Sequence, residues 1–346
     1  MNQNTNAKKL AIVLPVYNTA AYLRECLYAL ANQTCSDFSV FAIDDGSSDG
    51  SSDILDQFAK QHSWIHVVHK KNGGASSARN CALDLIESDG SFEYVGFTDS
   101  DDFVNRHLVE LVLTNLKRYQ ADYITFACKT FDKTGFLSEN FELPAFNILN
   151  QNEIAEHFCR KESTSHGRPD PTVRRWLATR VFKTSAIKGI RFKTSLPCGE
   201  DQEYFFQALP NLRKGVLLPK YLYFYRLRKS SLSHSIKAAH FELKIYEDLY
   251  TDTTHFSESV RSHIERLLIN AWWQETRQAY QCKDLSSIQN VKRIHRDLLS
   301  KQLLAPISNQ TRRRLIMFSL GDFFLSMYFN AKNKNKSNIE NTDFFD

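Results

Sequence analysis

Short apolar runs alternate with helix-like patterns through the first third of this 346-residue chain. The runs at 10–16, 38–43, 64–68 and 94–98 are rich in β-branched and aromatic residues, which is typical of buried strands. Another such run lies at 122–126. Between the runs, apolar residues recur every three or four positions, as on the face of a helix that packs on a sheet. This alternation predicts an α/β fold with a mostly parallel sheet covered by helices.

The C-terminal third has a different pattern. From about residue 240 onward the chain is predicted to be helical, with aromatic and aliphatic stripes. Residues 312–314 are arginines, and an apolar stretch at 315–329 follows them. This segment is expected either to lie on an anionic membrane surface or, because Asp322 interrupts it, to dock on the core as a terminal helix. The tail at 333–346 is expected to be disordered.

Composition places the chain among ordinary globular proteins, with 42% hydrophobic and 24% charged residues. The net charge of +5 suits anionic ligands but is too small to indicate a nucleic-acid-binding protein. The seven cysteines are scattered without a C-x-x-C spacing, as expected for reduced thiols. The N-terminal residues lack the apolar core of a signal peptide, and no run approaches the length of a membrane span. A cytoplasmic location is therefore expected.

Acidic clusters follow two of the predicted strands. Asp44 and Asp45 come after the second strand, and Asp99, Asp101 and Asp102 come after the fourth. In open α/β sheets, ligands bind outside the carboxyl ends of the strands. These clusters are therefore expected to converge on one cleft.

Five short motifs at a characteristic order and spacing suggest a family. They are PVYN (15–18), DDGSSD (44–49), NGGASSARN (72–80), DSDD (99–102) and GED (199–201). Together they resemble the family 2 glycosyltransferases, which have the Rossmann-like GT-A fold. The resemblance is close over residues 8–130 and looser over 190–235.

The resemblance implies an inverting glycosyltransferase that moves a sugar from a UDP-sugar to a saccharide or glycolipid acceptor in bacterial surface polysaccharide synthesis. It implies a GT-A domain at 1–235, with a nucleotide-sugar half (8–130) and an acceptor half (131–235). A helical C-terminal region at 236–332 would follow. Its basic and apolar segment would make any contact with the inner face of the plasma membrane.

The donor's base is assigned to the ends of the first two strands. The Tyr17 ring suits the face of a nucleobase, and the Pro15 and Val16 backbone suits its edge. Asp45 suits an imide N–H, which uracil has and cytosine lacks.

The motif at 72–80 has glycines, which let the backbone approach a ligand closely, and it leads into the N-terminus of a helix. Asn72 and Gly73 precede a helix whose N-terminus favours anions. Arg79 lies one turn inside this helix, and the resemblance assigns it to holding the nucleotide.

The D-x-D element is assigned to ribose and metal. Asp99 and Ser100 would bind the nucleotide, Asp101 would bind Mn²⁺ or Mg²⁺, and Asp102 would support them. Both metals suit carboxylates combined with diphosphate oxygens.

The remaining assignments lie further along the chain. Asp201 would be the general base that deprotonates the acceptor hydroxyl. Arg226 or Arg228 would bind the diphosphate, because arginine forks suit phosphate oxygens. His234 would complete the metal shell.

Two other functions fit parts of this pattern. One is a catalytically silent nucleotide-binding partner of a glycan assembly complex. The other is a sugar nucleotidyltransferase, which would need a glycine-rich, basic pyrophosphate loop directly after the first strand. Residues 15–18 supply no such loop. The donor sugar and the acceptor lie beyond the sequence.

Overall fold

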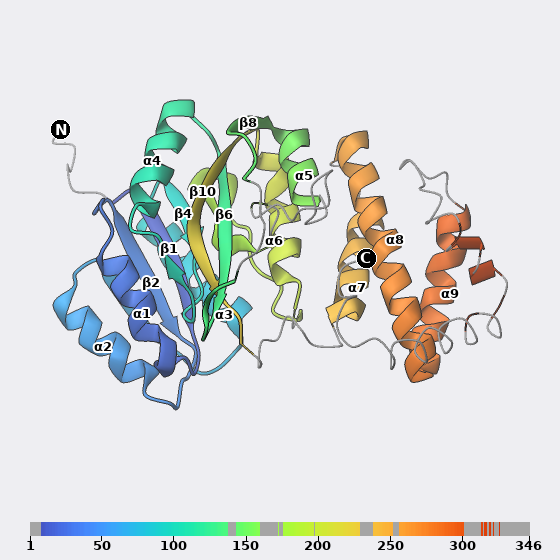
Figure 1. Cartoon of the computed structure of the whole chain (residues 1–346), viewed down its shortest axis with the longest axis horizontal. Helices are drawn as coiled ribbons and strands as arrows, with labels where there is room; N and C mark the ends of the chain where they lie inside the picture. The colour runs from blue at the N-terminus through green and yellow to red at the C-terminus, as the bar shows by residue number, and fades with distance from the viewer. Residues whose placement is uncertain are drawn as a thin grey trace. The chain divides into compact units, whose positions relative to one another are not determined.

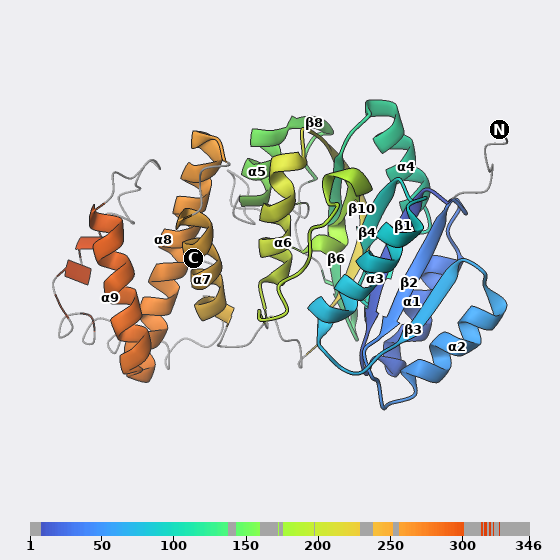
Figure 2. The same cartoon turned by 180° about the vertical axis from the view of Figure 1, so that it is seen from behind.

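The chain folds into two compact units, Met1–His234 and Ser235–Asp346. They are shown in Figure 1 and, from behind, in Figure 2. The computed structural model describes residues 8–137, 143–159, 172, 176–196, 198–228, 238–251 and 256–300, together with positions 313, 315, 316, 318, 319, 321 and 325. Each unit is considered by itself below.

One twisted sheet forms the centre of the first unit, with its strands in the order β3-β2-β1-β4-β9-β6-β10-β5. The main strands are β1 (Leu10–Val16), β2 (Phe38–Asp44), β3 (Ile65–His69), β4 (Tyr94–Phe97), β5 (Phe103–Val104), β6 (Tyr123–Asp132), β9 (Arg180–Lys183) and β10 (Lys214–Arg226). Two short strands pair beside them, β7 (Gly135–Phe136) with β6 and β8 (Asn147–Asn150) with β10. Strands β3, β2, β1 and β4 are parallel to one another, as are β6 and β10.

Helices cover both faces of this sheet (Figures 1 and 2). They are α1 (Ala20–Ala31), α2 (Ser51–Gln61), α3 (Ala75–Asp89), α4 (Leu108–Tyr119), α5 (Gln151–Cys159) and α6 (Glu200–Ala208). Strand β1 shows how the sequence divides the two faces. Its larger side chains, such as Leu10, Ile12 and Leu14, join one core cluster with the apolar stripes of α1, α2 and α4. The alternate positions carry Ala11 and Val13, and α3 packs on β1 and β2.

The mostly parallel α/β sheet predicted from the sequence is confirmed, and the first strand has the predicted bounds. The antiparallel strand β9 was not expected. It lies between β4 and β6 and pairs with both. It is only four residues long and carries Arg180, so it lacks the apolar run of a buried strand. The arginine is fully buried, donates from Nε to the Tyr123 hydroxyl (2.9 Å) and stacks its guanidinium 4.9 Å from the centre of the Phe158 ring.

The second unit is helical in its described part, with α7 (Ala238–Thr251), α8 (Glu258–Cys282) and α9 (Leu285–Ser300). Its core centres on Trp272, whose Nε1 donates to the Val291 carbonyl oxygen at 2.8 Å. Leu315 and Phe318 are also buried, and the Phe318 ring lies 5.0 Å from that of Trp272. These described positions of the basic and apolar segment therefore pack on the core. Contact of this segment with a membrane stays a prediction.

Among the helices of the described residues, none is long and apolar enough to cross a membrane.

Gly215 on β10 lies where any side chain would crowd α5. An added Cβ would be 2.9 Å from Ile154 Cγ1 and 3.0 Å from Tyr123 Cδ1. We expect Gly215→Ala to lower the free energy of unfolding by about 1–3 kcal/mol, measured by denaturant titration, because overpacking forces neighbours to shift. Ile154→Ala removes the obstructing atoms, so the double variant should lose less stability than the sum of the two single variants. Strict additivity would contradict this packing.

Candidate active site at the carboxyl ends of the strands

The loops that follow the first two strands are joined to each other by hydrogen bonds. Asn18 adopts a left-handed backbone conformation (φ 49°), which asparagine tolerates better than most residues. Its backbone N–H donates to Ser47 Oγ at 3.1 Å, and the Ser48 N–H donates to its Oδ1 at 2.8 Å. Beside these hydrogen bonds, Tyr17 is 51% exposed, while Val16 is buried. The loop thus presents an accessible aromatic ring next to the carboxyl end of β1.

Asp45, at the end of β2, is 2% exposed and already has several hydrogen-bond donors. Its carboxylate accepts from Lys70 Nζ (2.6 Å), the Gly73 N–H (3.0 Å) and the Gly74 N–H (2.7 Å). Gly74 is the N-cap of α3, so the carboxylate lies at the positive end of that helix. A base N–H would have to share this carboxylate with Lys70. Sequence reasoning did not select Lys70, although a lysine directly after a strand that borders a predicted phosphate loop was an available signal.

A side chain at Gly73, in the loop before α3, would crowd the Ser77 and Lys70 side chains. A Cβ on Gly73 would lie 2.7 Å from Ser77 Oγ and 3.1 Å from Lys70 Nζ. Asn72, next to it, is exposed. Backbone groups of this loop therefore stay close to Asp45.

Arg79 is the most strongly coordinated cation of this region. It is 7% exposed, donates from Nη2 to Asp99 Oδ1 (3.1 Å) and from Nη1 to Glu200 Oε1 (2.9 Å), and has Asp201 Oδ1 at 3.5 Å. Burial alone would lower its pKa, but the charges of Asp201, Asp99 and Glu200 outweigh burial and raise it. Arg79 thus joins the end of β4 to the start of α6. Sequence reasoning assigned this arginine to the nucleotide and did not anticipate Glu200 as its partner.

Asp201 lies in the first turn of α6. Its Oδ2 accepts from the Leu177 N–H at 3.1 Å, whereas its buried Oδ1 receives no hydrogen bond from the described residues. Burial raises the pKa of Asp201 to about 7, with the Glu200 and Asp99 charges adding to the rise and Arg79 opposing it. A carboxylate with this pKa and an unused oxygen can take up a proton near neutral pH.

The D-x-D element begins one residue beyond β4, and its members have separate partners. Ser100 is buried, and its Oγ accepts from Thr19 Oγ1 at 2.9 Å. The Asp101 carboxylate lies 2.5 Å from Arg228 Nη2. Burial, together with the Asp99 charge, raises the pKa of Asp101, and Arg228 opposes that rise.

Asp102 is the buried carboxylate that links the D-x-D element to β10. It is 1% exposed, and its carboxylate accepts from the Tyr223 hydroxyl (2.6 Å) and the Arg226 N–H (2.7 Å). The same hydroxyl accepts from the Asp99 N–H at 3.2 Å. Burial is the main cause that raises the pKa of Asp102, and the Asp101 and Asp99 charges add to it. Tyr223, which the sequence did not single out, therefore fixes the backbone of the motif from β10.

Arg226, the last residue of β10, and Arg228, just beyond it, both reach this motif. Arg226 donates from Nε to the Asp101 carbonyl oxygen (2.8 Å) and pairs with Glu25. Its guanidinium carbon also lies 4.4 Å from the centre of the Phe131 ring. Arg228 holds the Asp101 carboxylate itself. The site residues at the ends of β4 and β10 are thus adjacent.

The donor chemistry of this motif fits a divalent cation only in part. Asp99 and Asp101 supply hard carboxylate oxygens, which Mg²⁺ and Mn²⁺ prefer. No group of three or more His, Cys, Asp or Glu side chains in the described part of the chain is arranged to hold a metal. Mg²⁺ typically binds one or two carboxylates and completes its shell with substrate phosphates and waters, so the two carboxylates fit that mode. His234, the other expected ligand, lies outside the described residues.

Comparison with known proteins identifies the family. The model of the family described as "Glycosyl transferase family 2" matches residues 11–186, which is about half of the chain. The chain belongs to glycosyl transferase family 2. This confirms the resemblance carried by the five motifs.

The chain is similar to several bacterial glycosyltransferases. It is 28% identical to the uncharacterized glycosyltransferase EpsJ of Bacillus subtilis, over 65% of this chain and 62% of the relative. It is 30% identical to glycosyltransferase GlyA of Streptococcus pneumoniae, over 65% of this chain and 31% of the relative. A poly(ribitol-phosphate) beta-glucosyltransferase of Bacillus spizizenii is 27% identical over 66% of this chain and 34% of the relative. The chain thus matches less than two thirds of the length of each of these relatives.

Solved structures share the fold. Residues 1–349 of Staphylococcus aureus TarS, in complex with UDP-GlcNAc, superpose with a TM-score of 0.64 at 18% identity. The match covers 94% of this chain and 92% of that one. GalNAc-T7 with UDP, GalNAc and Mn²⁺ matches with a TM-score of 0.50 at 12% identity, over 76% of this chain and 51% of that one. At these identities the likeness establishes the GT-A-like fold.

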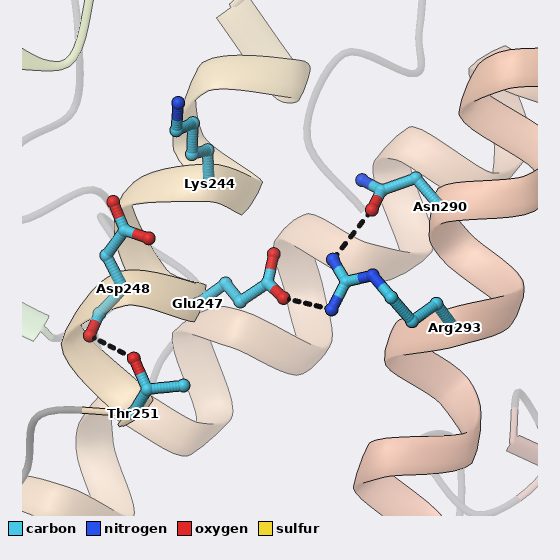
Figure 3. A pocket seen from close by; sticks show the side chains of 6 residues that line it. All are labelled: Lys244, Glu247, Asp248, Thr251, Asn290 and Arg293. Atoms are coloured by element: carbon cyan, nitrogen blue, oxygen red, sulfur yellow. Dashed lines mark hydrogen bonds and ion pairs between the residues drawn. The ribbon is translucent and has the colours of Figure 1, made fainter.

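A separate pocket of about 310 Å³ lies in the helical unit of this family 2 glycosyltransferase (Figure 3). Lys244, Glu247, Asp248 and Thr251 of α7 and Asn290 and Arg293 of α9 line it. Glu247 and Arg293 point toward each other and form an ion pair at 2.5 Å. The two cationic and two anionic lining side chains balance, so the pocket offers no excess charge for a diphosphate.

The raised pKa of Asp201 has a consequence for stability. The folded chain holds this proton more tightly than the unfolded chain, so the stabilisation is complete below a pH of about 4 and is lost as pH rises through about 7. Asp201→Asn removes this titration. We expect the free energy of unfolding of the variant minus that of the parent to be larger at pH 8 than at pH 5, measured by denaturant unfolding at both values.

The control for this comparison is Asp53→Asn, which changes an exposed carboxylate on α2. Its stability difference from the parent should vary little between the two pH values. Parallel behaviour of the Asp201 and Asp53 variants would contradict the assigned environment of Asp201.

Proposed function

We propose that this glycosyltransferase moves a sugar from a UDP-sugar to a saccharide or glycolipid acceptor by a single inverting displacement, assisted by Mn²⁺ or Mg²⁺. The pathway we propose is the synthesis of a bacterial surface polysaccharide. The observation that carries the proposal is Asp201: it is a buried carboxylate whose Oδ1 accepts no hydrogen bond from the described residues, and its ion pair with Arg79 links it to Asp99 of the D-x-D element.

Asp201 acts as the base in this proposal. Its Oδ1 accepts the proton of the acceptor hydroxyl while that oxygen forms a bond to the anomeric carbon of the donor sugar. On the opposite face, the bond from the anomeric carbon to the β-phosphate oxygen breaks, and the electron pair leaves with UDP. Because the Leu177 N–H holds Oδ2 at 3.1 Å, the Oδ1 atom keeps a fixed direction.

The nucleotide binds along the carboxyl ends of the parallel strands. Tyr17 covers the uracil ring, with the Pro15 and Val16 backbone at its edge. Asp45 accepts the imide N–H, sharing its carboxylate with Lys70. Asp99 and Ser100 face the ribose.

The diphosphate lies between the D-x-D element and the two arginines at the carboxyl end of β10, Arg226 and Arg228. Asp101 would hold the divalent cation, with His234 as a further ligand in this proposal. The bound cation would offset the negative charge that develops on the leaving diphosphate. Arg226 and Arg228 add charge-assisted hydrogen bonds to the same oxygens.

The names of relatives and of solved complexes support this proposal. TarS is described in complex with UDP-GlcNAc and with UDP, and GalNAc-T7 with UDP and Mn²⁺. We assign the nucleotide-sugar half to residues 8–130 and the acceptor half to 131–235. A cytoplasmic location belongs to the same proposal, with any membrane contact made through residues 312–329.

Substitution of the two key carboxylates tests the proposal. With Mn²⁺ or Mg²⁺, the purified protein should release UDP from one of UDP-glucose, UDP-galactose or their N-acetyl forms. We expect Asp201→Asn to lower kcat by about 10²–10⁴-fold with UDP affinity retained, because it removes only the base. Asp101→Ala should abolish turnover through loss of the metal. The readout is UDP release, with UDP affinity measured by calorimetry.

Asp248→Asn, in the pocket of the helical unit, is the matched control and should keep full turnover. Full turnover in both Asp101→Ala and Asp201→Asn would refute the site. UDP binding without transfer to any of a broad set of donors and acceptors would instead support a catalytically silent partner.

A further inference from the structure

Arg228 occupies the place where a divalent cation is expected. Its Nη2 lies 2.5 Å from Asp101 Oδ2, in the described structure, and its guanidinium carbon lies 5.5 Å from the centre of the Tyr22 ring. The Arg228 side chain is 29% exposed and that of Asp101 is 13% exposed. A positive charge of the protein's own therefore already neutralises the carboxylate assigned to the metal.

Each neighbouring carboxylate is stabilised by a different partner. Asp99 pairs with Arg79 at 3.1 Å. Asp102 accepts from two donors, the Tyr223 hydroxyl and the Arg226 N–H. The Asp101 carboxylate is matched with Arg228, and a cation that binds this carboxylate has to compete with that guanidinium.

Arg226, in contrast to Arg228, is held in place by several contacts. Its side chain donates to the Asp101 carbonyl oxygen, pairs with Glu25 and lies against the rings of Tyr22 and Phe131. Arg228 lies two residues beyond the end of β10, and among the described residues it contacts the Asp101 carboxylate and the Tyr22 ring. The Tyr22 ring can retain a guanidinium that has left the carboxylate, since a cation over an aromatic face remains stabilised.

We propose that Arg228 has two positions in the catalytic cycle: it holds Asp101 before substrate binds, and it moves to the diphosphate when a divalent cation replaces it on Asp101. This proposal rests on the proposed function, because it requires the metal and the UDP-sugar at this site. It makes Arg228 a competitor of the metal in the absence of nucleotide and a ligand of the nucleotide in its presence. Binding of metal and of UDP is then coupled through one side chain, and the coupling is reciprocal.

The test is calorimetric titration of the full chain with Mn²⁺ alone, with UDP alone in chelator, and with UDP at saturating Mn²⁺. Arg228→Gln removes the competitor, so we expect it to bind Mn²⁺ alone about tenfold more tightly than the parent. The same variant should lose most of the increase in UDP affinity that Mn²⁺ produces in the parent protein. Arg24→Gln, an exposed arginine of α1 that donates to Gln57, removes the same charge and should leave both values unchanged.

A second variant gives an independent readout without metal. Asp101→Asn weakens the hold on Arg228, so the guanidinium becomes available to the diphosphate. We expect this variant to bind UDP in chelator several-fold more tightly than the parent does. Circular dichroism of each variant establishes that it is folded.

The outcomes separate the two proposals. If the parent binds UDP and Mn²⁺ together but Arg228→Gln binds Mn²⁺ no more tightly, or Asp101→Asn binds UDP no more tightly in chelator, the exchange of Arg228 is overturned while the proposed function stands. If the parent binds neither UDP nor Mn²⁺, the proposed function itself fails.

Discussion

The buried guanidinium of Arg79 is the interaction on which the site depends. An arginine that is 7% exposed is costly unless its charge is compensated, and here Asp99, Glu200 and Asp201 surround it. These carboxylates come from the end of β4 and the start of α6, about a hundred residues apart in the sequence. Removing the arginine would leave three acidic groups without their shared cation. The same interaction therefore stabilises the fold locally and places the candidate base Asp201 beside Asp99 at the end of β4.

The other acidic groups follow the same physical rule with different partners. Asp45 is stabilised by Lys70 and by the N-terminus of α3, and Asp102 by the hydroxyl of Tyr223 and a backbone N–H. Asp101 is paired with Arg228, whose side chain is 29% exposed. Acidic side chains thus gather with their cationic partners at the ends of β2 and β4, and burial raises the pKa of Asp201 beside them.

Much of this fold was predictable because its strands are continuous apolar runs. β1 has the predicted bounds, and the parallel order of the sheet followed from the alternation of strands and helices. β9 was missed, because a four-residue strand carrying a buried arginine has no periodic signature. Its burial becomes visible only when Tyr123 and Phe158 are known to lie beside it.

The candidate site was also predictable only in part. The acidic residues were identified because each follows a strand or begins a helix. Their partners were not: Tyr223 reaches Asp102 across 121 positions, and Glu200 reaches Arg79 across the same separation. Sequence spacing carries no information on such pairs. Thr19 shows this too, because it lies at the N-cap position of α1 but directs its hydroxyl to Ser100 and makes no side-chain cap hydrogen bond.

The most direct test of this account is a crystal structure of the chain with UDP and Mn²⁺, with the ion located by its anomalous scattering. We expect the manganese in direct contact with the Asp101 carboxylate, the uracil between Tyr17 and Asp45, and Asp201 facing the side of the β-phosphate where a sugar would lie. A manganese peak and nucleotide density away from these residues would contradict it.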